Sequence, residues 1–397
     1  MPRSVWIMEA GGLANAFGTG VAYAFLVIYL HNVRGFPLAT AGLVLATGSV
    51  FGLAAGLAAG TAVDRVGARV TLAASLVLSA VGYAALPLVR HEWQAFLFTG
   101  VAGIGNGSFW PSQSALLVGL SPEARRHAAY SLQRMVRNLG IGLGGLVGGL
   151  IATISDPASF TVLFLVDAVS FLAFVAVLPL VPEPARVVDA RSPGRYLDVL
   201  GDRTFLAFVG LNVLFVAAGY AQLELLPVFA ANEAAVDERA IGLLFFVNTF
   251  VVVVAQLPVT KLVEGRRRMR ALALMTLLWG ASWLLVLVAG AWLEAIAAVA
   301  LLGVAMVVFA VGECFQGPTQ GALVADLAPP RLRGRYMALS AMSWEIGFIM
   351  GPAAGGFLLA VSPSALWSVA AAVCLLAGAG ALALERGIPP ELRLTPA

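Results

Sequence analysis

Charge is scarce in this sequence of 397 residues. Only 11% of the residues are charged and 60% are hydrophobic, whereas roughly a quarter of the residues of a soluble protein are charged. The net charge of +3 is small, and the basic residues cluster beside long apolar stretches. This composition excludes an ordinary soluble domain, and it gives no reason to expect a nucleic-acid partner.

The residue types that carry most enzyme and metal chemistry are also few. Lys261 is the only lysine, so a phosphate-binding Gly-x-x-x-x-Gly-Lys-[Ser/Thr] loop is excluded, and with it ATP coupling within this chain. The three histidines lie near the ends of apolar stretches, and Cys314 and Cys374 lie inside them. Because no catalytic or metal-binding constellation is visible, we expect no cofactor, and an integral membrane enzyme is the least favoured class.

Apolar stretches of about 20 residues, the length that spans a ~30 Å hydrocarbon core, are abundant. Each should be an α-helix, because backbone polar groups must be satisfied internally in lipid. We predict an all-α integral membrane protein with twelve transmembrane helices, near residues 6–30, 38–62, 69–89, 94–119, 127–153, 159–181, 204–230, 239–262, 270–289, 292–325, 335–359 and 362–384.

The positions of the basic residues predict the orientation, since cytoplasmic loops carry an excess of Lys and Arg. With the N-terminus in the cytoplasm, the outer loops hold only Arg34, Arg90 and Arg239. The inner loops then hold Arg65, Arg69, Arg125, Arg126, Arg186, Arg191, Arg195, Arg203, Lys261, Arg266, Arg267, Arg268, Arg270, Arg331, Arg333 and Arg335. We therefore expect a multi-pass protein of the cell membrane with both termini in the cytoplasm.

A polar segment rich in proline and charge interrupts the apolar pattern near the middle of the chain. We interpret residues 184–203 as a cytoplasmic linker between two six-helix bundles, residues 1–183 and 204–397. An ordinary loop is the simpler alternative, but the midpoint position favours a linker.

The two halves contain an internal repeat. The segment Pro111-Ser-Gln113-Ser-Ala-Leu116 recurs as Pro318-Thr-Gln320-Gly-Ala-Leu323, and 318 − 111 = 207. The same offset relates Gly140, Gly144, Gly148 and Gly149 to Gly347, Gly351, Gly355 and Gly356. Spans 4 and 5 are therefore equivalent to spans 10 and 11, and the two bundles should be pseudo-symmetric.

The loop between spans 2 and 3 carries the most specific motif. Its spacing, Gly60-x-x-x-Asp64-Arg65-x-Gly67-x-Arg69, resembles the signature loop between helices 2 and 3 of the major facilitator superfamily. The resemblance implies a secondary transporter that alternates access by rocking two halves. It also implies that Asp64 meets the inner end of span 11, near Arg333 and Arg335, and closes the cytoplasmic side. The second copy, at Pro258, Leu262, Gly265 and Arg267, has lost the acid, so we expect this function in the first half only.

Span 11 carries a glycine-proline motif like that of many drug/proton antiporters of this superfamily. The motif comprises Gly347, Gly351, Pro352, Gly355 and Gly356. Span 5 has the equivalent glycines Gly140, Gly144, Gly148 and Gly149, but Gly145 replaces the proline that is usual there. Glycines four residues apart let a neighbouring helix approach closely. They can serve plain packing or a pivot, and both interpretations stay open.

Polar residues inside spans are costly and usually face the bundle interior or a wet cavity. The resemblance implies that spans 1, 4, 7 and 10 line the central cavity. Our substrate-cavity candidates are Asn15, Tyr23, Asn106, Trp110, Gln113, Arg137, Asn138, Tyr220, Gln316, Gln320 and Trp344. Hydrogen bonding between helices is the alternative role for each.

Coupling to an ion gradient requires a titratable group. Glu313 is our first candidate because of its cavity-facing position, followed by Glu345, Glu224 and Asp167, although Asp167 can equally be structural. A carboxylate that is protonated in one access state and ionised in the other couples proton flux to substrate flux. We assign Glu9 no such role, because its place in the first turn of span 1 explains it.

We predict proton-coupled efflux of drugs or other amphipathic small molecules, by a monomer whose partners are its substrate and the lipid bilayer. Three alternatives stay open: an uptake permease for a sugar, organic acid or metabolite; a lipid flippase of the same fold; and a non-transporting membrane sensor. The sequence does not identify the substrate.

Overall fold

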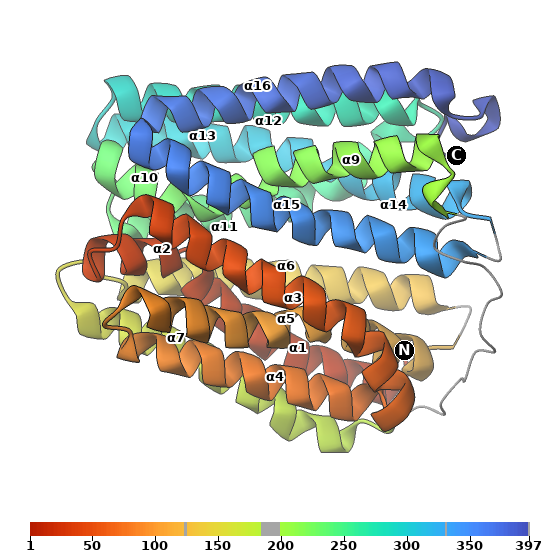
Figure 1. The fold of residues 1–397 in the computed structure, drawn as a ribbon, viewed down its shortest axis with the longest axis horizontal. Coiled ribbons are helices and arrows are strands. Elements are labelled where there is room, and N and C mark those ends of the chain that lie inside the picture. The colour runs from red at the N-terminus through yellow and green to blue at the C-terminus, as the bar shows by residue number, and fades with distance from the viewer. Residues whose placement is uncertain (123–124, 184–198, 330–331, 396–397) are drawn as a thin grey trace. The chain divides into compact units, whose positions relative to one another are not determined.

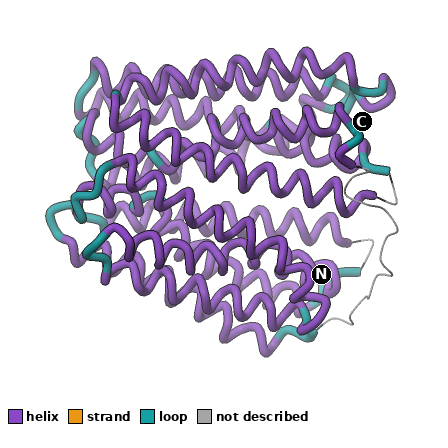
Figure 2. Tube along the Cα trace, in the orientation of Figure 1, coloured by secondary structure: helices purple, strands orange, loops and turns teal. Residues whose placement is uncertain are grey.

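Helices make up the architecture of the chain (Figures 1 and 2). The computed structural model describes residues 1–122, 125–183, 199–329 and 332–395. Within these residues there is no β-strand, and one isolated β-bridge joins Arg267 to Leu394. The predicted all-α class is therefore confirmed. Most of the predicted linker, residues 184–198, lies outside the described residues, so this division of the chain stays a prediction.

The chain forms two compact units, described separately below. Unit 1 comprises residues 1–188 with 237–249, and unit 2 comprises residues 189–236 with 250–397. The helices of unit 1 are α1 (Arg3–Tyr23), α2 (Leu26–Ile28), α3 (Leu38–Val66), α4 (Ala68–Ala85), α5 (Glu92–Leu120), α6 (Arg126–Ile151) and α7 (Pro157–Val177). Those of unit 2 are α9 (Arg203–Ala218), α10 (Leu226–Glu233), α12 (Arg268–Trp292), α13 (Ala295–Cys314), α14 (Gln316–Leu327), α15 (Arg333–Val361) and α16 (Pro363–Leu384). Helix α11 (Glu238–Val263) is divided between the units.

Ten helical segments in the described part of the chain are long and apolar enough to cross a membrane. They include every predicted span except the fourth and fifth, which correspond to α5 and α6. These two helices have 29 and 26 residues, so they are long enough, but their polar residues make them less apolar. Ten of the twelve predicted spans are thus supported by length and composition, and α5 and α6 stay predictions as spans.

Three predicted spans are interrupted by short breaks. The helix of the first span is interrupted at Ala24 and Phe25. The seventh span contains a 3-10 turn at Tyr220–Glu224, and the tenth span is interrupted at Phe315. The seventh and tenth breaks adjoin Glu224 and Glu313. Transporters place substrate and ion sites at discontinuous helices, where freed backbone groups meet a ligand.

Unit 1 encloses its first span. In the most apolar stretch of that span 72% of residues are buried, against 28–50% in the other nine candidate spans. Helix α1 packs against α6 and α7, and α5 packs between α3 and α4. Polar side chains of α1 therefore lie inside protein rather than in lipid.

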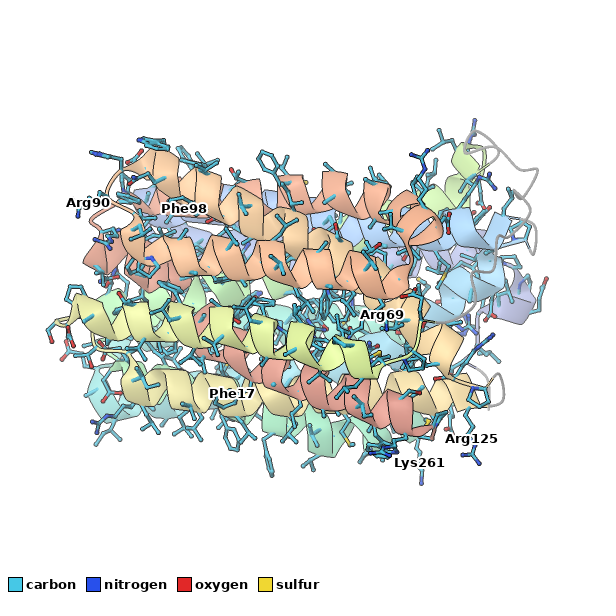
Figure 3. The ribbon with its side chains drawn as sticks, turned by 90° about the horizontal axis from the view of Figure 1, so that it is seen from below. Phe17, Arg69, Arg90, Phe98, Arg125 and Lys261 are labelled. Atoms are coloured by element: carbon cyan, nitrogen blue, oxygen red, sulfur yellow. The ribbon has the colours of Figure 1, made fainter. Side chains whose placement is uncertain are left out.

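The two ends of the helices in unit 1 carry different loops. Arg69 and Arg125 lie at one end of these helices, and Arg90 lies at the other (Figure 3). The arrangement matches the predicted loops on opposite sides of the membrane for these three residues.

Aromatic side chains fill the core of unit 2. Trp279, Trp283 and Trp367 are fully buried. The rings of Trp279 and Phe309 are stacked with centroids 5.0 Å apart, and Trp283 lies 5.1 Å from Trp367. Such contacts stabilise a core beyond the effect of area burial, so these rings help to hold the helices of unit 2 together.

Candidate functional site

The loop motif of the first half holds α4 to the end of α7. Gly67 adopts a φ of 101°, which allows the sharp turn between α3 and α4. The backbone N–H of Arg69 then donates to the Glu183 carboxylate at 3.1 Å, and Arg69 Nη1 donates to the Val181 carbonyl at 3.0 Å. The motif therefore fixes a turn within unit 1. Gly60, Asp64 and Arg65 are exposed, and a Cβ at Gly60 would meet nothing within 4 Å.

The predicted contact of Asp64 with the inner end of α15 would join the two units, and it stays a prediction. Arg335 is partly buried at that end of α15. The side chain of Arg333 lies outside the described residues.

The second copy of the loop is also held by charges, although it lacks the acid of the first copy. Gly265 adopts a φ of 67°. Arg267 Nη1 lies 2.8 Å from Glu385 Oε1, and Arg268 Nη2 lies 2.6 Å from Asp326 Oδ2. Acids from other segments thus pair with the arginines of this loop. The expectation that the gating function belongs to the first half only concerns function and stays a prediction.

The segment that follows α16 strengthens this second loop. Arg268 N–H donates to the Arg393 carbonyl at 2.9 Å, and Thr395 N–H donates to the Arg266 carbonyl at 2.9 Å. The Thr395 hydroxyl also donates to the Val263 carbonyl. In both units, then, the residues after the last helix bind the loop that carries the motif.

The glycines of α6 lie against two different helices. Gly140, Gly144 and Gly148 face α1, where a Cβ on Gly140 would lie 2.6 Å from the Ala16 Cβ. Gly149 faces the start of α11, and its Cβ would lie 2.6 Å from the Glu238 carbonyl oxygen. These glycines allow α6 to approach both neighbours at backbone distance.

The glycines of α15 make the equivalent contacts in unit 2. A Cβ on Gly347 would lie 2.5 Å from the Val216 Cβ, and one on Gly355 would lie 2.7 Å from Gln222 Oε1. Gly351 faces Ala217 and Ala221, and Pro352 and Gly356 are buried. The motif is thus packed against the break in the seventh span. This position is consistent with both roles predicted for the motif, plain helix packing and a pivot.

The polar candidates of α5 and α6 differ in exposure: Asn106, Trp110 and Arg137 are exposed, Asn138 is partly buried and Gln113 is buried. The Arg137 guanidinium lies 4.6 Å from the centre of the Trp110 ring, so these two candidates form a cation–π contact. Asn106 accepts a hydrogen bond from Ser79 at 3.3 Å.

Helix α1 carries Asn15 and Tyr23. Asn15 is buried, and its Nδ2 has no partner in the described residues. The Tyr23 ring lies edge-on to Phe245 of unit 1, with centroids 6.4 Å apart. Their role in a cavity stays a prediction.

Asp167 is completely buried between α7 and α1. The hydroxyls of Thr19 and Ser170 each lie 3.4 Å from its Oδ1, and its Oδ2 has no partner in the described residues. Ser170 uses its only proton in a 2.7 Å bond to the Asp167 carbonyl. The carboxyl group therefore lacks the donors that an ionised form would need in a dry interior.

Gln320 lies in a buried hydrogen-bond chain between helices of unit 2. Its Nε2 donates to Asn212 Oδ1 at 2.6 Å, and Asn212 Nδ2 donates to Ser343 Oγ at 2.6 Å. The chain joins α14, α9 and α15. Gln316 is buried nearby, with Nε2 unpartnered in the described residues. Gln320 therefore has the alternative role given above, a hydrogen bond between helices.

We expect Asn212→Ala to destabilise the protein, because it leaves Gln320 Nε2 buried without its acceptor. An unsatisfied buried donor costs about 1–3 kcal/mol. Thermal unfolding of the purified protein in detergent measures the loss, with Ser368→Ala, an exposed position on α16, as the control. Equal melting temperatures for the two variants would show that the chain contributes nothing to stability.

Tyr220 brings aromatic rings of three helices together in unit 2. Its ring centroid lies 5.1 Å from Trp344, 5.0 Å from Trp279 and 6.0 Å from Phe309. Glu224 follows Tyr220 by one turn, Glu313 follows Phe309 by one helical turn, and Glu345 follows Trp344 directly. All three carboxylates are partly buried. The structure thus brings two predicted residues, Tyr220 and Trp344, into ring contact. Glu224, Glu313 and Glu345 lie near residues of this cluster along the chain, and their place at a common site stays a prediction.

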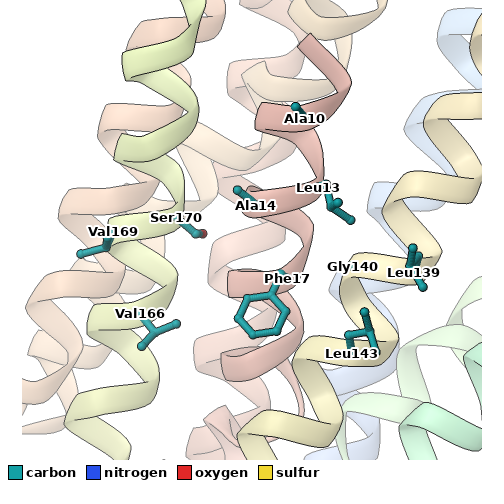
Figure 4. Close-up of a pocket in the computed structure, with 10 residues that line it drawn as sticks. All are labelled: Ala10, Leu13, Ala14, Phe17, Leu139, Gly140, Leu143, Val166, Val169 and Ser170. Carbon is teal, nitrogen blue, oxygen red and sulfur yellow. The ribbon is translucent and has the colours of Figure 1, made fainter. Parts of the chain in front are cut away.

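An apolar groove lies between α1, α6 and α7 of unit 1, and none of the predicted cavity residues lines it (Figure 4). Phe17, Leu139, Leu143 and Val169 line it, and Ser170 is its one polar lining residue. Its apolar surface suits lipid chains rather than a polar substrate.

Several structurally important residues were not identified from the sequence. Glu183, Glu385 and Asp326 pair with loop arginines from distant segments, which no local pattern indicates. A signal did exist for Gly48, Gly52, Gly103 and Gly107, since each pair has glycine spacing of four, and the structure sets the two pairs against each other. Asn212 is the one amide in α9 and could have been selected as a costly polar residue.

Comparison with known proteins agrees with this architecture. A sequence model described as Major Facilitator Superfamily matches residues 10–233 and 211–397. An uncharacterized MFS-type transporter, YttB, of Bacillus subtilis is 24% identical over 364 residues, covering 90% of this chain and 89% of the relative. Multidrug resistance protein MdtH of Yersinia enterocolitica is 23% identical over 342 residues, covering 84% of this chain and 82% of the relative. A Na(+), Li(+), K(+)/H(+) antiporter of Planococcus maritimus is 24% identical over 386 residues, covering 88% of each chain.

Solved structures share the fold at lower identity. A D-xylose-proton symporter has a TM-score of 0.77 and 17% identity, covering 97% of each chain. A peptide transporter crystallised with alafosfalin has a TM-score of 0.80 and 17% identity, covering 99% of this chain and 95% of the other.

Proposed function

Because the chain belongs to the Major Facilitator Superfamily, we propose that it is a secondary transporter that exports amphipathic small molecules, cationic ones preferentially, in exchange for protons. Membership makes the protein a multi-pass membrane transporter of small molecules rather than an enzyme, and the resemblance drawn from the loop motif is confirmed. The direction of transport, the substrate and the coupling ion are the proposal.

The aromatic cluster around Tyr220 carries the proposal. Tyr220 and Trp344 are partly buried, whereas Trp279 and Phe309 behind them are fully buried. The first two rings are therefore the ones that can meet a substrate, and cations are attracted to the faces of Tyr and Trp. In the proposal, Glu224, Glu313 and Glu345, which are near these residues along the chain, supply the negative charge of the site. Apolar walls with a few polar groups are typical of a small-molecule site, and this pairing suits an amphipathic cation better than a sugar.

Coupling follows from competition for the same carboxylates. A cationic substrate binds better to an ionised carboxylate, whereas a proton neutralises that carboxylate and weakens the attraction. If each access state exposes the site to one side of the membrane, protons that enter release the substrate to the outside. Protons are then the only coupling ligand that the scheme requires, and no cofactor is involved.

The relatives support export. Several proteins of similar length are named multidrug resistance proteins. An exporter of drugs would need a site for amphipathic molecules like the one proposed here. The remaining parts of the proposal are alternating access gated by Asp64, a monomeric protein, and a location in the cell membrane with cytoplasmic termini.

We expect Glu313→Gln to abolish substrate accumulation driven by a pH gradient and to preserve substrate exchange without a gradient, because glutamine keeps the shape but loses the proton. Uptake of a fluorescent organic cation into proteoliposomes measures both activities. Glu294→Gln, exposed before α13, is the control and should behave like the wild type. Gradient-driven accumulation that persists in Glu313→Gln would remove Glu313 from coupling.

A second candidate function is exchange of an alkali cation for protons. One observation favours it. The buried Asp167 carboxyl group and the Thr19 and Ser170 hydroxyls, each 3.4 Å from its Oδ1, supply oxygen atoms, which are the ligands that hard cations take. The Na(+), Li(+), K(+)/H(+) antiporter of Planococcus maritimus, a relative of this chain, also supports this second function. Dissipation of a pH gradient by added Na⁺ alone, without an organic substrate, would favour it over the first.

A further inference from the structure

Glu9 is a buried carboxylate that the proposed mechanism does not use. Its side chain lies on α1 with 3% of the residue exposed, and Oε1 has no partner in the described residues. Helix α1 begins at Arg3, so Glu9 lies in the second turn. The influence of the helix dipole falls off within the first turn. Placement at a helix N-terminus therefore does not explain this residue.

Helix α5 brings an amide group to Glu9. A Cβ built on Gly12 would lie 3.7 Å from both Glu9 Oε2 and Gln113 Nε2. The two side chains thus flank the same glycine, with no hydrogen bond between them among the described residues. Gln113 is itself buried, with 3% of the residue exposed.

Helix α6 brings a second amide group. Gly140 faces Ala16, and Gly144 faces Gly20, so the register between the helices is 140 − 16 = 124. Two turns earlier, the same register places Gln133 at the level of Glu9. Gln133 is buried, and its Nε2 has no partner in the described residues. Asn15 Nδ2, one and a half turns beyond Glu9 on α1, is likewise unpartnered.

No counter-charge balances Glu9. The charged residues on the helices that pack against it are Arg3 at the exposed start of α1, Glu92 at the far end of α5, Arg126, Arg134 and Arg137 on α6, and Asp167 on α7, which lies beside Gly18 and Thr19. Helix α5 contributes Gln113 and no charge at this level. Among the described residues, Glu9 takes part in no ion pair. An ionised Glu9 would therefore be a buried charge without compensation, which is costly.

We propose that Glu9, Gln113 and Gln133 form a buried proton-binding site in unit 1, in which Glu9 carries the proton and ordered water joins the three side chains. Three buried polar side chains, two of them with atoms unpartnered in the described residues, lie near the same level of three packed helices, and buried water typically satisfies two to four such atoms. The site lies at the Arg3 end of α1, on different helices from the Tyr220 cluster. Its contribution to coupling rests on the proposed function, whereas proton binding does not.

Infrared spectroscopy tests proton binding directly. A protonated carboxyl group has a carbonyl-stretching band that the ionised group lacks. In a pH-difference spectrum of purified protein in liposomes, we expect Glu9→Gln to remove one such band that the wild type shows. Glu92→Gln, at the exposed start of α5, should leave the band in place. Gln133→Leu should keep the band and move the midpoint of its titration, because it removes an amide that the water bonds.

A difference spectrum of Glu9→Gln that matches the wild type would overturn the proposal. Circular dichroism and gel filtration show whether the variant is folded, and glutamine preserves the size of the side chain. In proteoliposomes, Glu9→Gln should lose accumulation driven by a pH gradient and retain exchange. If the wild type itself shows no such accumulation, the proposed function fails, and the infrared band still decides whether Glu9 binds a proton.

Discussion

Gly107→Val is expected to prevent stable packing of unit 1. Helices α3 and α5 touch at backbone distance, and a Cβ at Gly107 would overlap the carbonyl oxygen of Gly52. Because the obstacle is backbone, no side chain can rotate away, and the helices must separate along their whole contact. Overpacking costs about 1–3 kcal/mol and occasionally more, and this site belongs at the upper end. Thermal unfolding in detergent and the yield of monodisperse protein measure the effect.

Gly210 supplies the matched control for this experiment. It also lies within a helix, α9, but a Cβ there would meet nothing within 4 Å. Gly210→Ala should leave the melting temperature unchanged or raise it, because replacing a helical glycine stabilises by up to about 1 kcal/mol. If Gly107→Val unfolds at the wild-type temperature, the close approach of α3 and α5 is wrong.

Arg268→Ala should produce the second large effect, a loss of about 3 kcal/mol in the free energy of unfolding. Arg268 is 2% exposed, and its Nη2 binds Asp326. Its removal empties a large volume at the start of α12 and leaves the Asp326 carboxylate without its cation. Asp326 is 40% exposed, so part of its charge is solvated, and packing accounts for much of the loss.

Two further variants separate the packing and charge contributions. Arg268→Met keeps most of the volume, so we expect less than half of the loss. Arg270→Ala removes an exposed arginine from the same helix turn and should cost little. Chemical denaturation in mild detergent gives all three values. Equal stability of Arg268→Ala and Arg270→Ala would contradict the buried pair between α12 and α14.

The sequence predicted the helical class, most spans and the superfamily, because these depend on local properties. Apolar length determines a span, and the loop motif is contiguous around Gly67. The breaks at Phe315 and Gly219 were not predicted, since apolar residues continue through both. Polar residues in α5 and α6 were predicted to lie in spans, and those residues make the two helices less apolar than the rest.

The partners of the site residues depend on tertiary packing, which a single sequence does not show. The second loop was expected to lack the gating function because Leu262 replaces the acid of the first copy, and this stays a prediction. The sequence did not show that arginines of this loop bind Glu385 and Asp326, residues 118 and 58 positions away. Glu9 was attributed to a helix terminus because the predicted span began too late, at residue 6 rather than Arg3. In these cases the partner or position of a residue depends on how distant segments pack and where a helix begins, which residue types alone do not reveal.

The cluster around Tyr220 shows what a pattern of residues along one helix face can predict and what it cannot. Trp344 and Tyr220 were both predicted for the cavity, and their rings lie 5.1 Å apart. Gln320 met the same criterion, yet it bonds to Asn212. A stripe of polar residues indicates that a helix face is buried in protein, but it does not distinguish a cavity from a neighbouring helix.

The central claim is that an inward proton gradient drives an organic cation out of the cell. Inside-out membrane vesicles with an acidic lumen test it most directly, using a fluorescent lipophilic cation. The account predicts accumulation in the lumen that collapses when the pH gradient is abolished and is absent from vesicles without the protein. Accumulation that requires an alkaline lumen, or none under either gradient with a range of organic cations, would contradict it.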